Sequence, residues 1–274
     1  MTTAKRNLAI LYGIGGLSDV GRHAILVALE EPTVEKIKVV TTFPEELDKP
    51  NWECGCIGGH TNPFKDPKFA AKLEMVEIDS WKKPHENRLA KHFEGVDAVV
   101  SCMGHRQPGR KYPELIEKGL IAYDGNRQVI QAMDSAKVDR AVVISSIALN
   151  GDKSWPHFAT GIMRFLFRTF NRKARKDLEA MEKIYVESSL DYLFVRPAGI
   201  SEECVPVGEY FIQDPGNKEV VVGGDMAKMD VARFMVDQAL NPTFHRTSKT
   251  VGGEPKSPGK DQLTDQPTEK EFDC

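Results

Sequence analysis

The chain has 274 residues, of which 41% are hydrophobic and 28% are charged. These proportions exclude a collagen-like, fibrous or wholly disordered protein, and they allow one large α/β core. The 37 basic and 40 acidic residues leave a net charge of −3, which gives no reason to expect nucleic acid as a partner.

From the amino terminus onward, short β-type runs alternate with helical patterns, which is typical of a parallel sheet with crossover helices. Strands are expected at residues 7–12, 36–41, 73–78, 98–102, 140–145 and 192–195, the last stopped by Arg196-Pro197. Helices are expected at residues 20–30, 115–136, 174–188 and 226–240. Every apolar run is far shorter than the roughly 20 residues of a membrane-spanning helix, so no transmembrane segment is expected.

This alternation predicts a Rossmann-type α/β fold, in which a doubly wound parallel sheet forms a single domain over residues 1–252. A small substrate-side region is expected from residues that follow the last predicted strand. Residues 43–67 are rich in proline, glycine and polar residues and predict a long loop. Residues 253–274 hold few large apolar side chains and predict a disordered tail, because burial there cannot offset the entropy of ordering.

The strongest single feature is a glycine-rich turn between the first expected strand and the first expected helix. It consists of Gly13-Ile14-Gly15-Gly16-Leu17-Ser18-Asp19-Val20-Gly21-Arg22. Glycines allow a tight turn and a close approach of the backbone to a pyrophosphate, and the helix amino terminus supplies amide donors. The strand before it and the helix after it favour dinucleotide binding over an ordinary strand–helix turn.

The choice between NADP and NAD depends on the second expected strand and on the first helix. The strand ends in Thr41-Thr42, without the acidic residue that often holds the ribose hydroxyls of NAD. Arg22 stands where a cation could reach a 2′-phosphate, although a solvated surface arginine is an equally simple interpretation. The sequence favours NADP as the cofactor, with NAD possible.

Three later segments carry a family resemblance: residues 95–104 (GVDAVVSCMG), residues 138–146 (VDRAVVISS), and Glu182 with residues 188–197 (SSLDYLFVRP). They resemble the atypical short-chain dehydrogenase/reductases. Within these, the chain looks like the NAD(P)H-binding group that includes biliverdin reductase B and the NmrA-like redox sensors. Residues 229–235 and 249–252 also fit, so the resemblance covers roughly residues 7–253.

The resemblance implies cofactor contacts at the ends of the expected strands. The glycines would line the pyrophosphate, Asp79 would meet the adenine edge, and Ser145 would lie near the nicotinamide. The cofactor-binding set is Gly13, Gly15, Gly16, Ser18, Asp19, Arg22, Thr42, Asp79, Ser80, Met103, Gly104, Ser145, Pro197, Ala198, Gly199 and Ile200. The turn from Gly13 to Gly21 is two residues longer than the family's Gly-x-x-Gly-x-x-Gly. Without the family frame, Asp79 reads equally as a helix cap and Ser145 as a satisfied strand-end hydroxyl.

One departure from the wider superfamily concerns the Tyr-x-x-x-Lys pair that handles the proton of a carbonyl. Counted back from Glu182 and Leu190, these positions hold Ala174 and Leu178. A proton would have to come from Ser146, Lys176, a substrate group or water. The departure argues against ordinary alcohol dehydrogenation. It fits both reduction of a conjugated acceptor and a protein that binds the cofactor only to sense it.

Two further segments admit several interpretations. Residues 158–176 are rich in arginine and lysine, and they could form a lid for an acidic aromatic ligand, a membrane-adhering face or a solvated helix. Cys54 and Cys56, with His60 nearby, are too few and too close in spacing for a tetrahedral metal site, so no metal is expected. The cysteines are odd in number and scattered, which favours a reducing, cytoplasmic compartment.

The functional hypothesis is an NADPH-dependent reductase of a conjugated or flavin-like small-molecule acceptor. Ser146 and Lys176 are the candidate catalytic residues. The alternative is a non-catalytic NAD(P)H-sensing or scaffold protein of the NmrA-like type, which would act through a protein partner. Loss of the Tyr–Lys pair is compatible with both hypotheses.

Overall fold

The computed structural model describes residues 4–13, 19–42, 44–48, 62–81, 88–103, 121–149, 172–201, 208–215, 217 and 222–254. The strands are β1 (Arg6–Tyr12), β2 (Val34–Thr41), β3 (Leu73–Glu77), β4 (Ala98–Ser101), β5 (Arg140–Ile144), β6 (Asp191–Pro197), β7 (Gly199–Ile200), β8 (Phe211–Gln213), β9 (Asp225–Met226) and β10 (Thr247–Gly252). The helices are α1 (Asp19–Glu30), α2 (Pro44–Asp48), α3 (Arg88–Phe93), α4 (Ala122–Ala136), α7 (Arg172–Glu187) and α8 (Lys228–Leu240).

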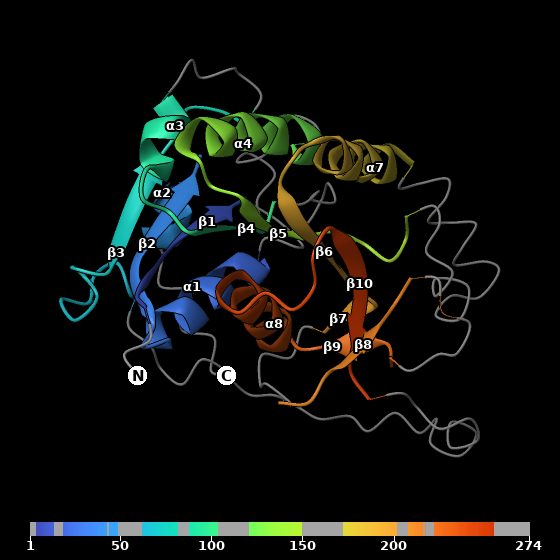
Figure 1. Ribbon diagram of the computed structural model, residues 1–274. Helices are drawn as coiled ribbons and strands as arrows, with labels where there is room; N and C mark the ends of the chain where they lie inside the picture. Colours follow the sequence, from blue (N-terminus) through green and yellow to red (C-terminus); the bar gives the residue numbers. More distant parts are fainter. Residues whose placement is uncertain are drawn as a thin grey trace.

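Eight of the strands form one twisted sheet in the order β3-β2-β1-β4-β5-β6-β10-β8 (Figure 1). All neighbouring pairs are parallel except β10 and β8. The chain leaves β1 toward β2 and β3 and then returns to the other side of β1 as β4. The predicted doubly wound Rossmann-type sheet is therefore confirmed, and its direction of winding switches between β1 and β4.

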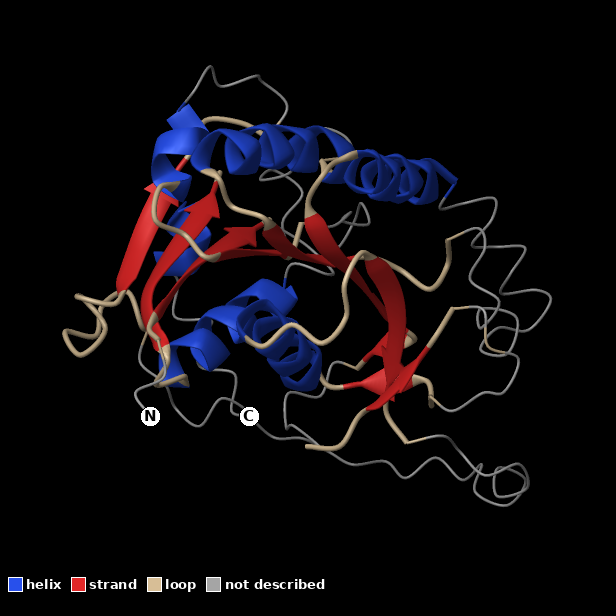
Figure 2. Ribbon diagram, viewed as in Figure 1, coloured by secondary structure: helices blue, strands red, loops and turns tan. Residues whose placement is uncertain are grey.

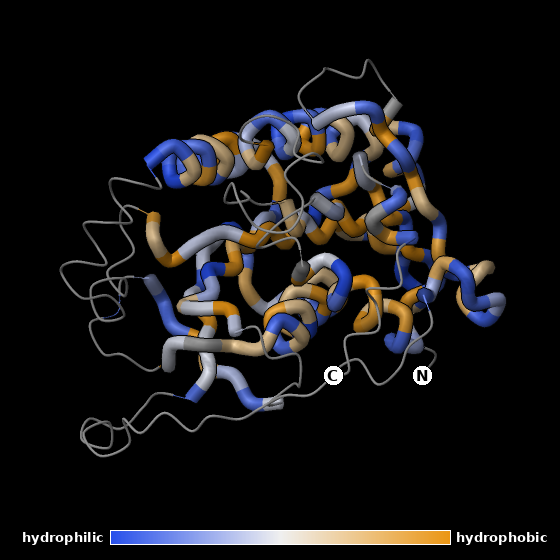
Figure 3. Tube along the Cα trace, turned by 180° about the vertical axis from the view of Figure 1, so that it is seen from behind, coloured by the Kyte–Doolittle hydropathy of each residue, from blue (hydrophilic) through white to orange (hydrophobic). Residues whose placement is uncertain are grey.

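Helices cover both faces of this sheet. Helices α1 and α8 pack against each other on one face, and α3, α4 and α7 lie in a row on the other (Figures 1 and 2). Along each helix, hydrophilic and hydrophobic residues alternate in short stretches, because only one side of the helix faces the sheet (Figure 3). None of the described helices is long and apolar enough to cross a bilayer.

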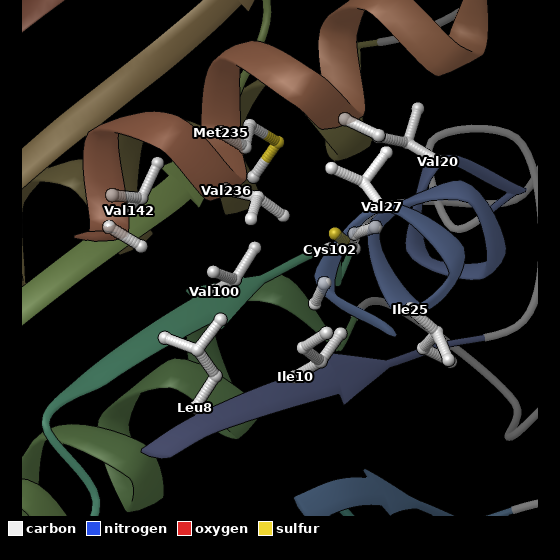
Figure 4. Close-up of a cluster of buried hydrophobic side chains, with 14 of the residues drawn as sticks. Leu8, Ile10, Val20, Ile25, Val27, Val100, Cys102, Val142, Met235 and Val236 are labelled. Atoms are coloured by element: carbon white, nitrogen blue, oxygen red, sulfur yellow. The ribbon is translucent and has the colours of Figure 1, made fainter. Parts of the chain in front are cut away.

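The core consists of two apolar clusters, one on each side of the sheet. Successive side chains of a strand point to opposite faces, so Leu8 and Ile10 join the cluster beneath α1 and α8, while Ala9 and Leu11 join the other. Figure 4 shows the first cluster, in which Leu8 and Ile10 lie near side chains of β4 and α8. Burial on both faces explains why the strand sequences are continuously apolar rather than alternating.

Cys102 follows β4 and is fully buried in the same cluster, beside Val27 of α1 (Figure 4). Burial raises the pKa of its thiol to about 12, so the reactive thiolate is scarce at neutral pH. We expect iodoacetamide at pH 7.5 to leave Cys102 unmodified in native protein and to alkylate it in urea, as read by mass spectrometry of its peptide. Rapid alkylation without denaturant would contradict this packing.

Several expected boundaries are wrong. Strand β6 does not stop before Arg196 but includes Pro197, because β10 runs alongside and the amide of Ala198 donates to the Val251 carbonyl (2.8 Å). The last helix begins at Lys228 rather than at 226, since Met226 pairs with Ile200 in the small β7–β9 sheet.

Other differences concern elements that the sequence did not predict and segments that the structure does not describe. The expected loop at residues 43–67 begins with helix α2, and α3 and β7 to β10 were not predicted. The glycine-turn residues 14–18, the cysteine loop at 49–61, the start of the helix expected at 115–136 and the tail from 255 onward lie outside the described residues. Gly253 is described, and its carbonyl accepts a hydrogen bond from the Gly223 amide (2.8 Å).

Candidate functional site

The carboxyl ends of β1 to β6 meet at one edge of the sheet, because these strands are parallel. In open α/β sheets, ligands bind at this edge, beside the point where the strand order reverses. The predicted residues Gly13, Thr42, Asp79, Met103 and Ser145 each follow one of these strands within two residues. The fold therefore places at one edge five residues that are far apart in the sequence.

The described part of the glycine turn consists of its two ends. Gly13 leaves β1, and a Cβ built there would make only ordinary contacts with Ile121 and Met103. Gly21 lies in the first turn of α1, where a Cβ would come within 2.9 Å of the Tyr12 ring and 3.3 Å of Cys102 Cβ. The missing side chain lets α1 begin directly against the ends of β1 and β4, with its amino terminus at the sheet edge.

The remaining residues of this turn are Gly15, Gly16, Ser18 and Asp19. The first three lie outside the described residues, and Asp19 is the first residue of α1. One helical turn further along, Arg22 is partly buried, and its guanidinium carbon lies 6.0 Å from the centre of the Tyr12 ring. Arg22 thus stands beside Tyr12, the last residue of β1.

Thr42 follows β2 and provides the clearest test of fit to a dinucleotide. Its Oγ1 is buried and has no hydrogen-bond partner among the residues that the structure describes. A buried hydroxyl without a partner is costly, and a ligand oxygen or amide at this edge would satisfy it. The end of the second strand is where Rossmann-type proteins meet the adenosine ribose. The ribose of a dinucleotide at this edge would therefore give the Thr42 hydroxyl the partner that it lacks among the described residues.

The end of β3 leads into a buried segment beneath the sheet edge. Asp79 is exposed there, whereas Ser80 and Trp81 are buried. The side-chain amide of Gln128 on α4 donates to the Trp81 carbonyl. Met103 is fully buried as well and packs against α4 at Gly125, close to the Trp81 ring. Gly104 lies outside the described residues.

Trp81 and Gln128 were not singled out from the sequence. Trp81 follows Ser80 directly, but the sequence holds no sign that Gln128, which is 47 residues later, fixes its carbonyl. The two residues anchor the segment that carries Asp79, and they leave that carboxylate facing solvent at the edge.

Two serines follow β5 and differ in their hydrogen bonds. Ser145 is fully buried, and its hydroxyl donates to Glu182 Oε1 on α7 (2.6 Å). Ser146 is partly buried, and its Oγ accepts from the Ala148 amide (3.1 Å). Within the described chain, the Ser146 hydroxyl proton has no acceptor. Of the two, Ser146 is the serine whose proton is available to a ligand.

Residues 197–200, which follow β6, are held from two sides. The Ala198 amide donates to β10, and Gly199 and Ile200 form β7, which pairs with β9. The Ser201 amide then donates to the Met226 carbonyl (3.0 Å). Residues 197–200, which the resemblance places among the cofactor contacts, thus form a paired segment at the carboxyl edge of β6.

The two positions at which the family resemblance implies a Tyr–Lys pair, 174 and 178, lie on helix α7. Ala174 is partly buried and Leu178 is buried, and neither provides an acid or base because both side chains are hydrocarbons. Lys176 is exposed, and no hydrogen bond or ion pair joins it to Ser146 within the described residues. The structure therefore does not bring the two candidate catalytic residues into contact.

The described tyrosine on α7, Tyr185, does not replace the missing acid. Its side chain is fully buried, and burial raises the pKa of its hydroxyl above the ordinary value. The hydroxyl donates to Asn126 Oδ1 (2.8 Å), which also accepts from Ser101 Oγ (3.0 Å). Tyr185 links α7, α4 and β4 from within the core and has no access to the sheet edge.

Helix α7 also caps its neighbour. Ile121 precedes α4 and provides no side-chain cap. Instead, the Asp177 carboxylate on α7 accepts hydrogen bonds from the amides of Ala122 (3.0 Å) and Tyr123 (3.3 Å). An acidic group at a helix amino terminus satisfies free amides and matches the helix dipole.

Cys54, Cys56 and His60 lie outside the described residues, as do residues 158–171 of the basic segment.

Comparison with known proteins gives one family match and one curated relative. The model of a family described as NAD(P)H-binding matches residues 60–242. Protein TIC 62, chloroplastic, from Arabidopsis thaliana is 25% identical over 171 residues, which are 62% of this chain and 24% of that protein. The chain therefore spans about a quarter of the length of this relative.

Solved structures resemble the fold along most of the chain. The anaerobillin reductase ChuY from Escherichia coli O157:H7 matches with a TM-score of 0.61 and 17% identity, over 92% of this chain and 99% of that chain. A short-chain dehydrogenase/reductase from Veillonella parvula, in complex with NADP, matches with a TM-score of 0.60 and 14% identity, over 93% and 95%. At these identities the likeness concerns the fold alone.

Proposed function

Because the chain belongs to the NAD(P)H-binding family, we propose that it is an NADPH-dependent reductase of a conjugated or flavin-like small-molecule acceptor. The observation that carries the proposal is the close packing of α1 at Gly21, which brings a helix amino terminus to the sheet edge at the switch between β1 and β4. Such a terminus offers amide donors and a positive dipole end to a pyrophosphate. The family match begins at residue 60, after the glycine turn, so the proposal that this turn binds the pyrophosphate rests on its position at the sheet edge.

The residues proposed to hold the cofactor follow the sheet edge from β3 to β6. The pyrophosphate would be surrounded by residues of the glycine turn: Gly13, Gly15, Gly16, Ser18 and Asp19. The adenosine ribose and its 2′-phosphate would be met by Thr42 and Arg22. The adenosine would be bordered by Asp79, Ser80, Met103 and Gly104. Ser145 and residues 197–200 would lie beside the nicotinamide. When bound, the cofactor supplies a hydride; reduction of the acceptor then needs one proton, which Ser146 or water would give.

A conjugated acceptor suits this site better than a simple ketone. With Ala174 and Leu178 at the two positions, α7 lacks the Tyr–Lys pair, and Tyr185 is committed to Asn126 in the core. A conjugated ring system spreads the negative charge that hydride addition creates, so a weak donor such as Ser146 suffices. The acceptor is expected to be planar and small enough to lie between β5 and the paired segment after β6.

The test begins with cofactor binding. Titration with NADPH and NADH, followed by nicotinamide fluorescence, is expected to give tighter binding of NADPH, and Arg22→Ala is expected to remove most of that preference.

Oxidation of NADPH should then depend on an added acceptor, with flavins screened first and linear tetrapyrroles second. Ser146→Ala should slow turnover more than it weakens NADPH binding. Absence of binding to either nucleotide would refute the proposal.

The second candidate is a non-catalytic NAD(P)H sensor, and the observation that favours it is the same lack of a Tyr–Lys pair on α7. Tight NADPH binding without oxidation by any acceptor, together with a protein partner captured only in the presence of NADPH, would favour this candidate.

A cytoplasmic location stays a prediction from the cysteine pattern. The Arabidopsis relative is described as chloroplastic.

A further inference from the structure

A buried carboxylate on α7 joins the carboxyl ends of β5 and β6. Glu182 Oε1 accepts hydrogen bonds from Ser145 Oγ (2.6 Å) and Arg196 Nε (3.0 Å), and Glu182 Oε2 accepts from Arg196 Nη2 (2.6 Å). The side chains of Glu182 and Arg196 are only 13% and 8% exposed. A two-point contact between a guanidinium and a carboxylate fixes direction as well as distance. We call these three residues the Glu182 cluster.

The Glu182 cluster lies directly behind the edge where the second half of a dinucleotide is expected. In a doubly wound sheet, the two halves of the ligand lie on opposite sides of the switch, which here falls between β1 and β4. Strands β5 and β6 lie on the β4 side of the switch, where the nicotinamide half of the ligand is expected. Ser145 precedes Ser146, and Arg196 precedes the segment 197–200, so the cluster touches both stretches that would border the nicotinamide.

The hydrogen bonds of the cluster also decide which serine can act as a donor. The Ser145 proton is directed at a carboxylate, the strongest acceptor available to it. Ser146 is left with a proton that has no acceptor in the described chain. Removing the carboxylate would free Ser145 to rotate and would leave the Arg196 guanidinium buried without its partner.

We propose that Glu182 is a positioning residue for the nicotinamide half of the site. It fixes Ser145 and Arg196, and through them the backbone of Ser146 and of residues 197–200. The adenosine half, which lies across the switch point, does not depend on it. This inference rests on the proposed function.

The same two strands carry a matched control at their opposite ends. Arg140, at the start of β5, pairs with Asp191, at the start of β6 (Nη1 to Oδ2, 3.0 Å), and the Arg140 side chain is 8% exposed. Both pairs join a buried arginine of β5 or β6 to a carboxylate, but Glu182 lies on α7, whereas Asp191 lies on β6 and is 29% exposed. The pairs also lie at opposite edges of the sheet, so a purely structural role predicts that neither variant alters ligand binding selectively in folded protein.

The experiment compares Glu182→Gln with Asp191→Asn. Urea unfolding measures stability, and two ligands measure the site: NADPH, and 2′-phospho-ADP-ribose, which lacks the nicotinamide. We expect both variants to be less stable. Only Glu182→Gln should weaken NADPH binding, by about tenfold, whereas 2′-phospho-ADP-ribose should bind each variant about as tightly as wild type.

A second variant keeps the test valid if Glu182→Gln does not fold. Glu182→Met combined with Arg196→Met replaces the buried pair by apolar side chains of similar length, an exchange that folded proteins often tolerate. It should show the same selective loss for NADPH. Equal losses for both ligands, or no loss for either, would overturn the inference while leaving the proposed function intact. Wild-type protein that binds neither ligand would instead refute the proposed function, and the inference with it.

Discussion

Replacing Gly21 by alanine is expected to lower the free energy of unfolding by about 1–2 kcal/mol and to weaken NADPH binding. The new Cβ would lie 2.9 Å from Cδ2 of the Tyr12 ring and 3.3 Å from Cys102 Cβ. Both neighbours are buried at the ends of β1 and β4 and have little room to move. Helix α1 must therefore shift away from the sheet, and its amino terminus shifts with it. Urea unfolding and a fluorescence titration with NADPH measure the two effects.

Gly125→Ala is the matched control for this change. Gly125 also lies near the start of a helix, α4, and faces the sheet, but its new Cβ would meet the flexible end of Met103 at 2.8 Å. A methionine side chain can rotate away at small cost, and alanine favours the helix over glycine by about 1 kcal/mol. We expect a change in stability within about 1 kcal/mol of zero. If both alanine variants had the same effect, Gly21 would not be a close-packing position.

Replacing Arg140 by methionine is expected to lower the free energy of unfolding by about 3 kcal/mol, the largest effect of any single change considered for this protein. The guanidinium is buried and donates to the carbonyls of Gln238 and Phe244 as well as to Asp191. Burial lowers the pKa of Arg140, and Asp191 partly offsets this. Loss of the side chain leaves buried carbonyls without donors and loosens the end of α8 from β5.

Arg6→Met serves as the control for Arg140→Met. Arg6 pairs with Asp97 at the same edge of the sheet (3.5 Å), but its side chain is 48% exposed, so water replaces the contact easily. The loss should be less than about 1 kcal/mol. Neither change should alter NADPH affinity in folded protein, because both pairs lie at the edge opposite the site. Reduced affinity in a folded Arg140→Met sample would contradict the placement of the site.

The sequence by itself determined the sheet from β1 to β6 and the edge at which we propose the site. Strands such as Ala98–Ser101 and Arg140–Ile144 are buried on both faces, so their apolar runs were visible locally. The residue after each run, such as Thr42 or Ser145, could be placed at the carboxyl edge for the same reason. What is local in the chain was therefore predictable.

Elements that become strands only beside a partner strand could not be predicted from the sequence. Strand β10, Thr247–Gly252, is mostly polar and becomes a strand because it lies between β6 and β8. Arg196 and Pro197 extend β6 for the same reason. Short or mixed segments carry too weak a pattern to be recognised before their neighbours are known.

The partners of buried charges were decided only by the tertiary structure. Glu182 and Arg196 were part of a recognised motif, but nothing in their spacing showed that they meet, or that Ser145 joins them. Nor did the sequence show that Asp177 caps a helix 55 residues earlier. Which carboxylate is placed against which donor depends on how α7 packs on the sheet through its buried side chains Leu178, Met181 and Tyr185, and the spacing of the charged residues does not reveal that packing.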